Sequence, residues 1–117
     1  MRLKAAIWVK AYLRICAAAG AQAFVVRHGD DDAGAIFLKV TRADRTAQIF
    51  APAPTGLDEA VYDRRWICIS GAAPIDERDA DARLERETKL DSDMWLIEVE
   101  ERDGRHFLDD WLLKSET

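Results

Sequence analysis

Residues 23–40, AFVVRHGDDDAGAIFLKV, decide the fold class, because two apolar runs of strand character flank a short polar loop. In the second run Ile36, Leu38 and Val40 share one face, with the period of two that is typical of a strand. A third apolar run, TAQIFA, follows the polar turn TRADR. We therefore predict an antiparallel β-meander over residues 22–51.

The preceding residues 1–20 have the three- and four-residue apolar spacing of a helix that packs one side on a core. Trp8 and Tyr12 lie on this apolar side. Lys10 and Arg14 fall on the opposite side, which makes them candidates for a basic, partner-binding face. The same two charges interrupt the apolar run, so we expect a mature helix rather than a secretory signal or a membrane span.

The rest of the chain predicts a second helix and further strands. Asp76 is a suitable N-cap for a charged helix, and Asp103-Gly104 is a strong signal for a two-residue hairpin turn. The expected elements are a helix at 1–20, a meander at 22–51, a loop at 52–65, a strand at 66–70, a helix at 76–90, a β-hairpin at 94–108 and a tail at 109–117. We predict one α+β domain, residues 1–117, with the element order α-β-β-β-β-α-β-β. Its antiparallel sheet of about five or six strands carries both helices on one face.

The formal net charge of −5 is unevenly distributed along the chain. Met1 to Gly29 contains five basic residues and no acidic ones, whereas Asp76 to Thr117 contains 15 acidic and 7 basic residues. The overall negative charge argues against binding of nucleic acid by the whole surface. The two cysteines lie in apolar runs without a CxxC spacing, which predicts reduced thiols and a cytoplasmic location.

The polar loop RHGDDDAG contains the main candidate binding residues. In one hypothesis Asp30 and Asp32 offer hard oxygen ligands to a divalent cation, with His28 nearby as an acid or base. In the other, the loop is only a turn, in which aspartates accept backbone N–H bonds and glycines adopt unusual dihedral angles. A binding edge formed with Arg27 and Lys39 would accept an anionic group.

A complete catalytic constellation is absent from the sequence. The order of helix and strands resembles a nuclease core, but the third strand, TAQIFA, lacks the carboxylate and lysine of its metal site. The chain also lacks a phosphate-binding GxxxxGK[ST] loop, a GxSxG elbow, an HExxH helix and a zinc-site spacing. We therefore expect no cofactor and assign no metal ligand.

Three segments, RHGDDDAGAIFLKV, APAPTG and SDMWLIEVEERDGRHFL, in that order, resemble a family of small alphaproteobacterial proteins catalogued as domain of unknown function 1491. The resemblance extends from the amino-terminal helix to Leu108. It implies a bacterial, cytosolic, single-domain protein without an assigned biochemical role, and it transfers no catalytic residue. Members of this family often have Arg in place of His28.

These observations favour a non-enzymatic module that binds a protein partner or a small ligand, with a homodimer as one such form. The alternative is a metal-dependent hydrolase, nuclease-like in character, centred on Asp30 and Asp32. Whether the protein is an enzyme stays open at this point, although the missing constellation favours a binding role.

Overall fold

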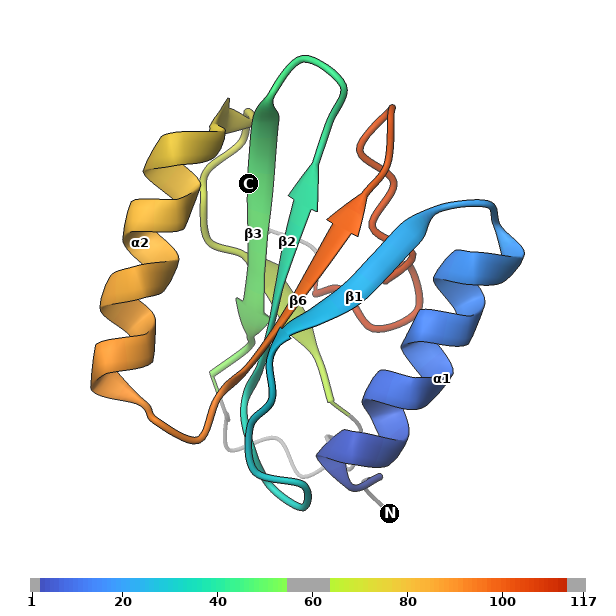
Figure 1. Cartoon of the computed structure of the whole chain (residues 1–117), viewed down its shortest axis with the longest axis vertical. Coiled ribbons are helices and arrows are strands. Elements are labelled where there is room, and N and C mark those ends of the chain that lie inside the picture. Colours follow the sequence, from blue (N-terminus) through green and yellow to red (C-terminus); the bar gives the residue numbers. More distant parts are fainter. Residues whose placement is uncertain (1–2, 55–63, 114–117) are drawn as a thin grey trace.

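The computed structural model describes residues 3–54 and 64–113 as a six-stranded sheet with two helices (Figure 1). The elements are α1 (Ala5–Ala18), β1 (Gln22–Arg27), β2 (Ile36–Thr41), β3 (Thr46–Pro52), β4 (Trp66–Cys68), β5 (Ile75–Asp76), α2 (Glu77–Leu90) and β6 (Trp95–Glu100). The predicted α+β class, with about six strands and two helices, is confirmed. The predicted loop at 52–65 and tail at 109–117 lie partly outside the described residues.

The strands do not follow one another as a simple meander. Their order across the sheet is β1-β6-β2-β3-β4, with β5 pairing β3 beside this path. Strand β6 is antiparallel to β1 and parallel to β2, which makes the sheet mixed. The prediction that β1 and β2 pair as a hairpin was therefore wrong, and only β2 and β3 form the expected antiparallel pair. A parallel neighbour requires a long crossover, which here contains β3, β4, β5 and α2.

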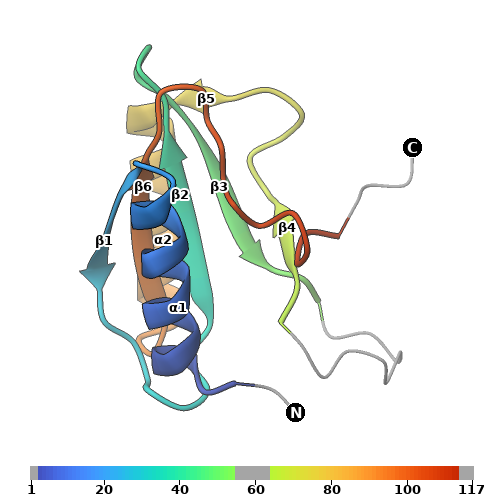
Figure 2. The same ribbon diagram turned by 90° about the vertical axis from the view of Figure 1, so that its right-hand side faces the viewer.

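The two helices cover opposite faces of the sheet (Figures 1 and 2). On the α1 face, Trp8 and Tyr12 belong to one buried cluster with Leu38, whereas Leu84 of α2 packs with Phe37 on the other face. The expectation of both helices on one face was wrong. All six residues of β2 are buried, because this central strand has apolar side chains on both faces that need a cover.

The predicted β-hairpin at 94–108 was also wrong in its second half. Strand β6 ends at Glu100, and the chain then turns as the Gly104 amide donates to the carbonyl of Glu101 at 3.0 Å. The following residues run irregularly until Leu108 enters the core on the α1 side. Strand β5, only two residues long, precedes α2 and was not predicted. The observed element order is therefore α-β-β-β-β-β-α-β.

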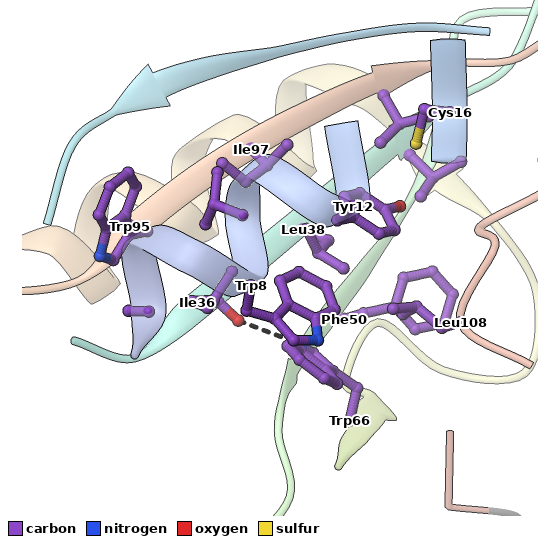
Figure 3. Close-up of a cluster of buried hydrophobic side chains, with 14 residues drawn as sticks. Trp8, Tyr12, Cys16, Ile36, Leu38, Phe50, Trp66, Trp95, Ile97 and Leu108 are labelled. Carbon is purple, nitrogen blue, oxygen red and sulfur yellow. Dashed lines mark hydrogen bonds between the residues drawn. The ribbon is translucent and has the colours of Figure 1, made fainter. Parts of the chain in front are cut away.

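Tryptophan side chains form the centre of the core beneath α1 (Figure 3). The Trp8 ring stacks on Tyr12 with 4.9 Å between ring centroids, and it contacts Trp66 at 4.3 Å. The buried Trp66 indole Nε1 donates a hydrogen bond of 2.9 Å to the carbonyl of Ile36 at the start of β2. Trp66 therefore fixes β4 to α1 by packing and to β2 by a directed bond.

The substitution Trp66→Phe tests this linkage. It keeps an aromatic ring but removes the donor to the Ile36 carbonyl and leaves a small cavity, so we expect a loss of about 1–3 kcal/mol in unfolding free energy. Urea denaturation followed by circular dichroism measures the loss. Trp111→Phe is the matched control, because Trp111 is only partly buried and contacts Trp8 edge-on. An equal loss in both variants would contradict the role given to the Trp66 bond.

Candidate functional site

The loop between β1 and β2 folds around Asp30. Its carboxylate Oδ2 accepts the backbone N–H groups of Asp32 at 3.1 Å and Ala33 at 2.9 Å, which is an Asx-type turn. The Asp30 backbone amide donates to the carbonyl of Asp93 at 2.9 Å, and its carbonyl accepts the indole N–H of Trp95 at 2.8 Å. Asp30 thus holds the loop closed and ties it to the start of β6.

The same loop caps the amino terminus of α1. The carbonyl of Asp32 accepts the amide of Ala5 at 3.1 Å, and the carbonyl of Asp31 accepts the amide of Ala6 at 2.9 Å. These are helix N–H groups that have no partner within the helix, and Lys4 at the N-cap makes no side-chain cap. The loop acids also lie where the helix dipole favours negative charge. A structural task therefore accounts for the position of the loop.

The side chains of His28 and Arg27 also make contacts at this end of the sheet. His28 Nε2 lies 2.7 Å from Asp31 Oδ1, and its ring lies 4.0 Å from the Trp95 ring between centroids. Arg27 Nη2 donates to the carbonyl of Ser92 at 2.9 Å. Gly29 is required by close approach, because a Cβ there would overlap the Asp93 carbonyl.

The structure thus brings four of the five sequence-predicted binding residues together: Arg27, His28, Asp30 and Asp32. Within residues 3–54 and 64–113 there is no group of three His, Cys, Asp or Glu side chains that could hold a metal ion. Lys4 Nζ lies 3.7 Å from Asp32 Oδ1. The geometry around these aspartates is therefore that of a turn and a helix cap.

Lys39, the fifth predicted residue, lies elsewhere, on the α2 face of β2. Its side chain is 5% exposed, and its Nζ lies 2.6 Å from Asp81, 2.8 Å from Glu98 and 3.2 Å from Glu77. Burial alone would lower the pKa of Lys39, but the hydrogen bonds to Asp81, Glu98 and Glu77 raise it above its ordinary value. The lysine therefore stays charged and ties α2 to the two central strands.

The pH dependence of the stabilisation by Lys39 follows from the raised pKa of this lysine. Because the pKa of Lys39 is higher in the folded chain than in the unfolded one, its stabilisation is fully present below the ordinary lysine pKa and is lost only at more alkaline pH. This stabilisation is therefore constant around neutral pH.

Removing the cation should expose the repulsion among the three acids. Lys39→Met leaves Glu98, Asp81 and Glu77 facing one another without a counter-charge, so we expect a loss of about 2–4 kcal/mol at pH 7. Guanidinium denaturation at pH 7 measures it, and Lys89→Met, which removes an exposed lysine of α2, is the control. A loss no larger than that of Lys89→Met would contradict this interpretation.

The predicted basic face of α1 is solvent-exposed. Lys10 and Arg14 are both exposed and form no ion pair within the described part of the chain. The large apolar side chains of Ile7 and Ile15 on the same helix are also exposed, at 51% and 39%. This face is therefore available for contact.

Sequence reasoning missed the most exposed apolar segment of the sheet. Strand β1 lies at the open edge, and Phe24, Val25 and Val26 are 42%, 38% and 54% exposed. The signal was present in the sequence, since three consecutive apolar residues in a strand place apolar side chains on both faces. The sequence pattern did not show that β6 lies between β1 and β2 and so leaves β1 at the edge.

A second feature that was missed is the buried carboxylate of Glu101, which organises the turn after β6. Its Oε1 accepts the amides of Asp103 at 2.8 Å and Arg105 at 3.0 Å, and its Oε2 accepts Arg105 Nε at 3.0 Å and Nη2 at 2.9 Å. The bonds from the Arg105 backbone and side chain lower the pKa of Glu101 to about 2. The turn is therefore a rigid structure and not a flexible connection.

This depressed pKa predicts an acid-dependent loss of stability. Because the pKa of Glu101 falls from the ordinary 4.5 to about 2, its stabilisation is present above pH 4.5 and disappears as the pH falls through 2. Glu101→Gln should lower the unfolding free energy by about 1.5–3 kcal/mol at pH 7. The difference from the unsubstituted protein should shrink towards pH 2, which urea titrations across this range would measure. A difference that does not depend on pH would contradict the assigned role of the charge.

The fold and these features define a small α+β protein with an open sheet edge. A structured loop between β1 and β2 lies at one end of the sheet, and a structured turn after β6 lies at the other. The family model described as "Protein of unknown function (DUF1491)" matches residues 3–109, and the chain belongs to this family. Its resemblance to the family, inferred above from three segments, is thereby confirmed. A search of curated proteins finds none of similar sequence.

Three solved structures are similar over most of the chain. The crystal structure of a DUF1491 family protein from Caulobacter crescentus CB15 is 38% identical, with a TM-score of 0.79, covering 97% of this chain and 100% of that one. An NMR structure of a DUF1491 family protein from the same organism is 39% identical, with a TM-score of 0.78 and coverage of 97% and 99%. The solution structure of protein Atu0922 from A. tumefaciens is 34% identical, with a TM-score of 0.74 and coverage of 86% and 87%.

None of the helices among the described residues is long and apolar enough to cross a membrane.

Proposed function

We propose that this protein is a non-enzymatic interaction module, and that its binding surface is the open edge of the sheet at β1. The observation that carries the proposal is the exposure of Phe24, Val25 and Val26 on a strand that pairs on one side only, with β6. The partner that fits this edge best is a second copy of the chain. This is the homodimeric form of the binding role that the sequence favoured.

The backbone of an edge strand offers unpaired N–H and C=O groups to another strand. Proteins that avoid such pairing place lysine or proline on the edge, or cover it. Strand β1, QAFVVR, has no lysine or proline, and its single charged residue, Arg27, is at its end. Figure 2 shows β1 at the margin of the sheet, with α1 beside it and no element of the described chain beyond it. The edge is therefore open to another strand over Gln22–Val25, whereas a register shift between Val25 and Arg27 interrupts the regular ladder beyond it.

A second copy fits because the strand is complementary to itself. Antiparallel pairing of two β1 strands about a twofold axis would place the apolar centre of one strand against that of the other. Arg27 of each copy would lie beyond the pairing centre, near Gln22 of its mate, so that no two like charges would be opposed within the pair. The result would be a continuous sheet across both copies, with the two α1 helices on the same face.

The hydrolase alternative has less support. The carboxylate of Asp30 is engaged by backbone amides, and that of Asp32 lies beside Lys4. Metal-dependent turnover that is lost in Asp32→Asn, with the fold retained, would nevertheless favour that function over the interaction module.

Sedimentation equilibrium tests the proposed self-association. Between about 1 µM and about 1 mM, the weight-average mass should rise from that of the 13.2 kDa chain towards twice this value. The variants Phe24→Lys and Val26→Lys should stay monomeric over the same range, because a charge on the strand opposes pairing. Their circular dichroism spectra and thermal midpoints establish that each variant is folded.

Leu90→Lys provides the matched control. Leu90 is 83% exposed at the end of α2, more than Phe24, Val25 or Val26 of β1, but it lies away from the edge. If general surface hydrophobicity caused association, Leu90→Lys would weaken it as much as Val26→Lys, and the proposal would fail. A wild-type protein that stays monomeric at the highest concentration would also overturn the proposed self-association. The remaining candidate partner for the β1 edge would then be an extended segment of another protein.

A further inference from the structure

The two turns at the upper end of the sheet in Figure 1 border an open polar pocket of about 540 Å³. One turn joins β2 to β3, and the other follows β6; the amide of Ala43 donates to the carbonyl of Arg102 at 3.4 Å between them. The lining residues are Gln22, Thr41, Arg42, Ala43, Arg45, Glu77, Glu100, Glu101 and Arg102. The pocket has the size of a small-ligand site and lies at the opposite end of the sheet from the Asp30 loop.

Three arginines line this pocket without an ion-pair partner among the described residues: Arg42, Arg45 and Arg102. Two of the lining acids already have partners of their own. Glu77 bonds to Lys39, and Glu101 is held by Arg105 through two side-chain bonds. Arg105 neutralises Glu101, but Glu77 shares the single charge of Lys39 with Asp81 and Glu98. The three arginines therefore face Glu100 and part of the charge of Glu77, and Arg42 also acts on Asp44.

Arg42 is held in place although its own polar atoms are not fully used. Its guanidinium packs against Gly104, where an added Cβ would lie 2.5–2.7 Å from the guanidinium atoms, and the positive φ of 81° at this position favours glycine. Its Nε is buried and has no hydrogen-bond partner among the described residues. The nearby Asp44 is engaged within the turn, since its carboxylate accepts the amide of Thr46 at 3.1 Å and the hydroxyl at 2.6 Å.

We propose that this pocket binds a small ligand that carries a phosphate monoester. Guanidinium groups pair with phosphate through several parallel N–H bonds, and none of the three lining arginines forms an ion pair with a described residue. Among the other lining side chains, those of Gln22, Thr41 and Glu100 are polar and suit a hydroxyl-bearing body such as a sugar. This site is separate from the edge-strand function, because it lies at the turns and not along the exposed centre of β1.

Isothermal titration calorimetry on the full chain tests the site, with inorganic phosphate, ribose 5-phosphate and ribose as probes. Ribose 5-phosphate should bind, inorganic phosphate should bind more weakly and ribose should not bind. The affinity for ribose 5-phosphate should fall at least about tenfold in Arg102→Gln, because the substitution removes one charge from the lining. It should also fall as salt is raised, because ions screen the arginine charges.

Arg86→Gln is the matched control, because Arg86 is an exposed arginine of α2 that does not line the pocket. Arg102 is likewise exposed, so Arg102→Gln should keep the thermal midpoint of the unsubstituted protein, whereas Arg42→Gln is checked for folding first. Equal weakening by Arg86→Gln, equal binding of ribose, or no binding of either phosphate probe would overturn the proposal. None of these results bears on whether β1 self-associates, so the two proposals fail independently.

Discussion

The insertion of β6 between β1 and β2 is the constraint on which the remaining structure depends. Its parallel pairs with β2 extend from Ile36 opposite Trp95 to Thr41 opposite Glu100, while its other side pairs with β1. Burying β2 and β6 in the middle of the sheet creates two apolar faces, and each receives one helix. The same insertion displaces β1 to the edge, where its apolar side chains stay exposed.

The parallel orientation also determines what meets at each end of the sheet. Both β2 and β6 begin at the end where the Asp30 loop caps α1 and bonds to Asp93, which explains the dense polar sequence there as structural support. Both strands finish at the opposite end, where their following turns bring Arg42 and Arg102 to one pocket. The acids that face Lys39 on the α2 side come from β6 and α2, so this cluster also depends on β6 being adjacent to β2.

Local patterns in the sequence predicted local structure well. The spacing of Trp8 and Tyr12 indicated the buried side of α1, and Asp76 caps α2 by accepting the amide of Arg78 at 2.8 Å. The predictions that were wrong concerned features that depend on residues distant in the sequence. Adjacent runs of strand character suggested a hairpin, but no local pattern reveals that a strand some sixty residues later separates them. Asp103-Gly104 did form a turn, yet Glu101 bonds it into an irregular segment and not into a returning strand.

The candidate site shows the same difference between local features, which the sequence predicted, and features that depend on distant residues. The sequence placed Arg27, His28, Asp30 and Asp32 together, because they are neighbours in one loop, but it could not show that helix capping and turn bonds use them. The β1 edge is the clearest surface for binding, and hydrogen–deuterium exchange of its amides tests this role most directly. If β1 pairs with a second copy, its outward-facing amides should exchange more slowly at about 1 mM than at about 10 µM protein, while the exposed turns stay unchanged. Identical exchange along β1 at both concentrations would contradict the binding edge.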